Sequence, residues 1–182
     1  MDQRWADLAR TLRECGMWQG FSEADAEAGE RAVAEGSYPF GGDATADEEP
    51  GTRWFSVDGE AMAEGGVPRE LREPAAVLPA HGVELRVENV KLDDDEYVVA
   101  INDRRCVVWT RHDRNTWFVS TARPFAVVND LLEAAGAVPR IFLINPGANT
   151  GEAWLLDPRI VEAVAKSGLV KDESMPMLAT HV

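Results

Sequence analysis

Residues 97–109 read Tyr97-Val98-Val99-Ala100-Ile101-Asn102-Asp103-Arg104-Arg105-Cys106-Val107-Val108-Trp109, and this stretch indicates the centre of a sheet. Its two ends, residues 97–101 and 106–109, are apolar on both alternating faces, which is typical of strands covered on both sides. Asn102 and Asp103 tolerate positive φ and suit a tight hairpin turn. The stretch therefore predicts two central antiparallel strands.

Strands are also expected on either side of this hairpin. Val83, Leu85 and Val87 alternate with charged residues, which is the period of a half-buried strand. Asp93-Asp94-Asp95 forms the polar tip of the connection that follows, and residues 116–121 are predicted to be a fourth strand. We thus expect a four-strand antiparallel meander.

The C-terminal half adds helices and a second hairpin. Pro124 suits the first turn of a helix that ends near Gly136, and this helix should cover one face of the sheet. Residues 140–145 and 153–156 are predicted to pair as a C-terminal hairpin. Asp157 and Pro158 begin the last helix. The tail after Lys171 is expected to be irregular.

The N-terminal part is predicted to be helical. Trp5, Leu8 and Leu12 follow helical spacing, and Ser22 can cap a second helix that runs to Glu35. Breakers and acids then fill residues 36–51, which we interpret as a long acidic loop, either a functional loop or a plain connector. The prediction is a single α+β domain over residues 1–182: a helical segment with the acidic loop (1–51), a sheet core (52–170) and a tail (171–182).

Charge is the most informative global property. The 182 residues hold 18 Lys and Arg against 32 Asp and Glu, a net charge of −14, and residues 22–64 hold twelve of the acids against only Arg31 and Arg53. Such a field repels nucleic acids and anionic lipid surfaces and attracts basic partners. Acidity that merely keeps the protein soluble is the plain alternative. The chain offers no apolar run for a signal peptide or membrane span, and its two cysteines fit free thiols, so a cytoplasmic location is expected.

No motif in the sequence indicates catalysis, a metal or a cofactor. The three histidines have no Cys or His at ligand spacing, and no nucleophile elbow or phosphate loop is present. The run Asp93 to Glu96 is too compact for an EF-hand loop, whose acids alternate. The sequence therefore favours a non-catalytic protein without cofactors.

We expect this protein to bind another protein, one with a basic surface. The predicted partner-binding residues lie in the acidic loop, beside it and at the hairpin tip: Asp43, Asp47, Glu48, Glu49, Trp54, Asp93, Asp94 and Asp95. A small-molecule-binding domain or an enzyme is the alternative, with a pocket at Asn145 and Asn149 in the turn 145–151. An assembly subunit is a third possibility, and the oligomeric state stays open.

One stretch resembles known sequences. Asn129, Leu132, Gly136 and Arg140, followed by Gly147, Asn149, Gly151 and Leu155-Leu156, form a pattern similar to one in uncharacterised bacterial proteins. Some of those proteins resemble immunity partners of secreted toxins. The resemblance covers about the last 60 residues and implies a bacterial protein that neutralises a toxin, without catalytic residues.

Overall fold

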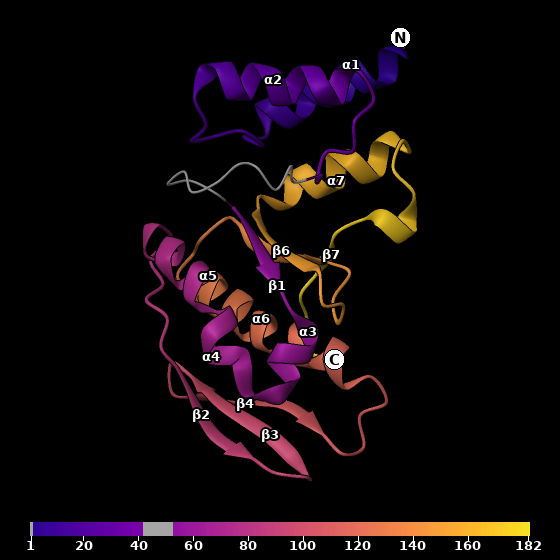
Figure 1. The fold of residues 1–182 in the computed structure, drawn as a ribbon. Coiled ribbons are helices and arrows are strands. Elements are labelled where there is room, and N and C mark those ends of the chain that lie inside the picture. The colour runs from indigo at the N-terminus through magenta and orange to yellow at the C-terminus, as the bar shows by residue number, and fades with distance from the viewer. Residues whose placement is uncertain (1, 42–52) are drawn as a thin grey trace. The chain divides into compact units, whose positions relative to one another are not determined.

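The computed structural model describes residues 2–41 and 53–182, which divide into two compact units (Figure 1). The first unit comprises Met1–Arg53 and Leu156–Pro176, and the second comprises Trp54–Leu155 and Met177–Val182. Each unit is described by itself. The expectation of one domain over residues 1–182 stays a prediction.

The first unit is built from helices. They are α1 (Gln3–Glu14), α2 (Glu23–Ala34), α7 (Pro158–Ser167) and the short 3-10 helix η3 (Asp172–Ser174). The predicted caps are confirmed, since the side chain of Ser22 accepts the N–H of Asp25 and that of Asp157 accepts the N–H of Arg159. Gly168 ends α7 with a left-handed φ of 62°.

The second unit holds two sheets. The first has the order β1-β6-β5-β7, and its strands are β1 (Trp54–Val57), β5 (Arg140–Ile144), β6 (Gly151–Leu156) and β7 (Met177–Leu178). The other has the order β2-β3-β4, with β2 (Val87–Leu92), β3 (Glu96–Ile101) and β4 (Arg104–Thr110). The pairs β1/β6, β2/β3, β3/β4 and β5/β7 are antiparallel. The α+β class, the antiparallel pairing and the C-terminal hairpin of β5 and β6 are confirmed.

Short helical pieces connect β1 to β2. They are α3 (Gly59–Ala61), the π-turn η1 (Met62–Gly66), α4 (Val67–Glu70), α5 (Arg72–Val77) and η2 (Leu78–His81). Asp58 caps α3 by accepting the N–H of Ala61. Gly65 turns the chain inside η1 with a φ of 99°, which only glycine adopts without strain.

The long helix α6 (Thr116–Ala134) corrects the predicted meander. Residues 116–121, expected to be a fourth strand, form its first turns, because the side chain of Asn115 accepts the N–H of Phe118 and caps the helix there. Pro124 consequently lies inside this helix instead of starting one. The meander therefore has three strands.

One further strand prediction and the prediction of an irregular tail need correction. Residues 83–86 carry no strand, and β2 begins only at Val87, because the side chain of Asn102 donates to the carbonyl of Glu84 and accepts the N–H of Arg86 in place of a neighbouring strand. The tail after Lys171 is not irregular throughout, since β7 pairs with β5 through Met177–Leu143 and Leu178–Phe142. Ala179 continues this contact by donating its N–H to the carbonyl of Ile141.

The core of the second unit gathers around α6. Helix α6 contacts β4, β5, α3 and η1, and it is buried on most sides, as expected for a helix covered from several directions. Among the described residues, its neighbours in the core include Tyr97, Val99, Ile141 and Leu143, which are fully buried. The two sheets and α6 thus share one apolar interior.

Candidate functional site

The predicted patch Asp93 to Asp95 forms the tip of the β2–β3 hairpin. One oxygen of Asp93 accepts the N–H groups of Asp95 and Glu96, both at 3.0 Å, and the N–H of Asp93 donates to the carbonyl of Glu96. A carboxylate that satisfies two turn N–H groups fixes the turn in the way of an Asx-turn. Asp93 is therefore an element of the turn itself.

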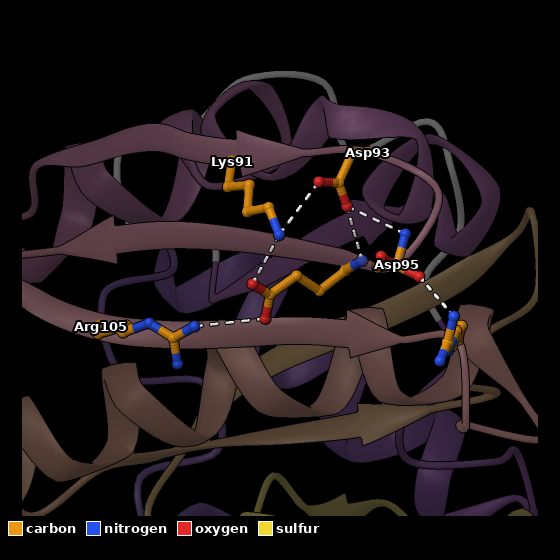
Figure 2. Close-up of polar contacts among 6 residues, drawn as sticks. Lys91, Asp93, Asp95 and Arg105 are labelled. Atoms are coloured by element: carbon orange, nitrogen blue, oxygen red, sulfur yellow. Dashed lines mark hydrogen bonds and ion pairs between the residues drawn. The ribbon is translucent and has the colours of Figure 1, made fainter.

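Three cations surround this tip (Figure 2). The Nζ of Lys91 lies 3.0 Å from a carboxylate oxygen of Asp93 and 3.0 Å from one of Glu96. The second oxygen of Glu96 is 3.3 Å from Arg105, and Asp95 is 2.9 Å from Arg111. The ion pairs thus run across all three strands of the sheet and offset most of the negative charge of the tip.

The pKa directions agree with this geometry. The pKa of Asp93 is lowered by the N–H of Glu96 and by Lys91, and the pKa of Lys91 is raised by Glu96 and Asp93. Both groups are therefore charged at neutral pH. Asp94 is exposed and, among residues 2–41 and 53–182, its side chain has no hydrogen-bond or ion-pair partner. It is the carboxylate of this tip that stays available to a partner.

The cations of the hairpin were missed by sequence reasoning. Arg105 and Arg111 lie nine and sixteen residues from Glu96 and Asp95, and strand register brings them together. The signal was the hairpin turn at Asn102 and Asp103, which have φ values of 47° and 64° as predicted. Counting residues outward from that turn places β3 opposite β4.

The acidic loop lies largely outside the described residues, and this holds for Asp43, Asp47, Glu48 and Glu49. Trp54 is the first residue of β1 and pairs with Trp154 of β6. It is partly buried, and its Nε1 is a buried atom without a hydrogen-bond partner in the described part of the chain. The structure thus places Trp54 within a sheet, apart from the hairpin tip of β2 and β3.

Helix α2 carries an acidic surface that the sequence reading did not single out. The helix and its C-cap residue hold Glu23, Asp25, Glu27, Glu30 and Glu35 against Arg31. Arg13 of α1 pairs with Glu23 at 2.5 Å and with Glu30 at 2.7 Å. The side chains of Glu27 and Glu35 are exposed and, in the described residues, have no such partner. We call Glu27 and Glu35 the free acids of α2.

The turn 145–151, predicted to border a pocket, is packed closely by its backbone. Gly147 has a φ of 83°, and a Cβ there would lie 2.6 Å from the backbone nitrogen of Phe118. Gly59 donates its N–H to the carbonyl of Ala148 at 3.0 Å. Asn145 and Asn149 are exposed, and the amide of Asn149 donates to Glu60 at 3.2 Å. The two asparagines therefore lie on a compact surface turn.

Two surface hollows occur within the first unit. One of about 470 Å³ lies between α1 and α7, and its lining includes Leu8, Cys15 and Arg159. The other, of about 400 Å³, lies between α1 and α2 and includes Glu27 in its lining. Charged side chains of both signs lie in the lining of each hollow, and neither hollow includes Asn145 or Asn149 in its lining.

Comparison of the chain with protein-family models, with curated proteins and with solved structures gave no match. Within the described residues, no group of three His, Cys, Asp or Glu side chains could hold a metal ion. The helices of the same residues are also too short or too polar to cross a membrane.

Proposed function

We propose that this protein is a non-catalytic binding module that captures a basic partner protein through acidic surfaces. The observation that carries the proposal is the set of free acids of α2, because exposed carboxylates without an ion-pair partner project their field into solvent. Asp94 adds one such group on the hairpin. The acids at 43, 47, 48 and 49 continue the sequence after α2 and stay part of the prediction.

Electrostatic attraction of this kind acts mainly on the rate of association. A negative surface steers a cationic partner during diffusion, and the effect weakens as salt screens the charges. In this proposal the protein resides in the cytoplasm, which agrees with the free thiols Cys15 and Cys106. A bacterial immunity protein that neutralises a basic toxin is one form of the proposal, supported by the resemblance over residues 129–156.

The test is capture of partners from the host lysate on the tagged protein at low and high salt, with identification by mass spectrometry. The captured partner is then purified, and its association rate is measured with the wild type and with the variant E27K/E35K. We expect the rate to fall at least about tenfold in the variant and to fall with salt in the wild type.

A matched control separates the acidic surface from net charge alone. E84K/E133K makes the same change of charge at two exposed positions of the second unit, and should retain most of the association rate. Equal losses in both double variants would show that α2 is not the binding surface. A partner whose binding ignores salt and both variants would contradict the electrostatic proposal.

A further inference from the structure

The free edge of the three-stranded sheet carries an unused pairing surface. Strand β2 is the outermost strand in the order β2-β3-β4, as Figure 1 also shows. Residues 88–92 are all exposed, including Val90 at 63% and Leu92 at 49%. An edge strand of this kind presents unpaired backbone N–H and C=O groups that can pair with another strand.

Two backbone hydrogen bonds to the residues that flank β2 define which of its residues face this edge. The carbonyl of Arg86 accepts the N–H of Asn102 at one end of the strand, and the N–H of Asp93 donates to Glu96 at the other. Because backbone groups alternate in an antiparallel pair, Glu88 and Lys91 direct theirs toward β3. Val87, Asn89 and Leu92 direct theirs toward the free edge.

A β-bulge in β2 changes which of its residues lie on the same face of the sheet. The register of β2 against β3 shifts between Asn89 and Lys91, so Glu88 pairs with Ala100 and Lys91 pairs with Val98. Ala100 and Val98 are two residues apart and lie on one face of β3, and paired residues share a face. Glu88 and Lys91 therefore lie on the same face, although residues three apart in a regular strand lie on opposite faces.

We propose that β2 pairs antiparallel with β2 of a second copy of this chain, about a two-fold axis between Asn89 and Val90. In this register Glu88 lies opposite Lys91 of the second copy, and Val87 lies opposite Leu92. The two residues of each pair have their side chains on the same face of the sheet and their backbone groups directed the same way, toward β3 or toward the free edge. In a regular strand these residues would differ in both respects, so the pairing depends on the bulge. In this register each charged residue of β2 thus faces a residue of opposite charge in the second copy.

Lys91 can form the additional ion pair with Glu88 of the second copy. Its ammonium group has three N–H donors, and Asp93 and Glu96 each lie 3.0 Å away. The carboxylate of Glu88 from the second copy supplies the third acceptor. Glu88 itself has no partner among the described residues. A bulge and a lysine usually protect an edge strand from association. Here the bulge and Lys91 fit a second copy of β2, whereas a strand without the matching bulge and glutamate would not fit.

The experiment measures the mass of the full chain in solution by sedimentation equilibrium up to about 100 µM protein. The wild type should approach twice the 20.0 kDa chain mass as concentration rises. E88K sets two lysines opposite each other at both ends of the pair, so its dissociation constant should rise at least about tenfold. E84K, the same change at an exposed residue before β2, should leave the constant unchanged.

Mixing provides the complementary measurement. K91E should also be monomeric, and an equimolar mixture of E88K and K91E should form a dimer, because each lysine then faces a glutamate. If K91E does not fold for lack of its pairs with Asp93 and Glu96, E88K against E84K decides alone. A monomeric wild type at every concentration overturns the proposal, and so does a dimer that E88K leaves unchanged.

Discussion

Asn129 and Ile141 hold each other by two reciprocal hydrogen bonds. The Oδ1 of Asn129 accepts the N–H of Ile141 at 2.6 Å, and its Nδ2 donates to the carbonyl of Ile141 at 3.0 Å. The same Nδ2 also donates to the carbonyl of Ala179 at 3.0 Å. The buried side-chain amide of Asn129 on α6 therefore forms hydrogen bonds with the backbone of β5 and with the segment that follows β7, as a neighbouring strand would.

Replacement of Asn129 should be strongly destabilising. N129A leaves the N–H of Ile141 without its side-chain acceptor in a buried site, and unsatisfied buried groups cost about 1–3 kcal/mol each. We expect the free energy of unfolding to fall by about 2–4 kcal/mol in urea denaturation. The control E133A, at an exposed position of the same helix, should change it by less than about 0.5 kcal/mol. Equal stability of N129A and wild type would contradict this account.

The pair of Asp113 and Arg123 predicts a stability change in acid. Arg123 donates to both carboxylate oxygens of Asp113, at 2.8 and 2.9 Å. The side chain of Asp113 is 16% exposed and that of Arg123 is 18% exposed. These hydrogen bonds, with those from Thr110, lower the pKa of Asp113 from 3.8 to about 2. The unfolded chain therefore binds the proton more readily, and the folded state loses stability as pH falls from about 4 to about 2.

D113N removes this dependence. Its free energy of unfolding at neutral pH should be lower by about 1–2 kcal/mol, and the slope against pH between about 2 and 4 should be shallower than in the wild type. D103N changes an acid that is 95% exposed and sits at a positive φ that asparagine tolerates, so it serves as the control. An unchanged slope in D113N would show that other carboxylates govern the acid transition.

Ser120 should be replaceable by alanine without loss of stability. Its side chain is fully buried, and its hydroxyl has no hydrogen-bond partner among the described residues. The desolvation of this hydroxyl is uncompensated, so S120A should raise the free energy of unfolding by up to about 1 kcal/mol. Thr121 offers the contrast, because its hydroxyl donates to the carbonyl of Trp117 at 3.0 Å. T121V should therefore cost about 1 kcal/mol, and a larger loss in S120A than in T121V would refute the prediction.

Local signals of the sequence predicted most of the helix starts and the tight turn. Ser22 and Asp157 cap helices as expected, because a short polar side chain before a helix can accept a free backbone N–H of the first turn. The apolar run Trp117-Phe118-Val119 misled, since short apolar runs have no period that separates strand from buried helix. Asn115 was the overlooked signal of the helix start.

The remaining features depend on contacts between distant residues. The tail strand β7 consists of two residues and exists because β5 pairs with it and Asn129 binds the next residue, Ala179. The ion pairs of the hairpin likewise depend on register, so a run of acids in the sequence did not indicate which carboxylates a cation already holds. The free acids of α2 likewise depend on tertiary contacts, because Arg13 of α1 pairs with Glu23 and Glu30 and leaves Glu27 and Glu35 without a partner in the described residues.

The two cysteines should differ in reactivity. Cys106 is 4% exposed, and burial raises its pKa to about 11, so the reactive thiolate is scarce and sterically shielded in the folded protein. Cys15 is partly exposed and lines the hollow between α1 and α7. A thiol reagent such as Ellman's reagent should modify Cys15 at least about tenfold faster than Cys106 under native conditions. C15A should abolish the fast phase, C106A should retain it, and both thiols of the wild type should react together in denaturant. A fast phase that survives in C15A would show that the core around Cys106 opens more readily than its burial implies.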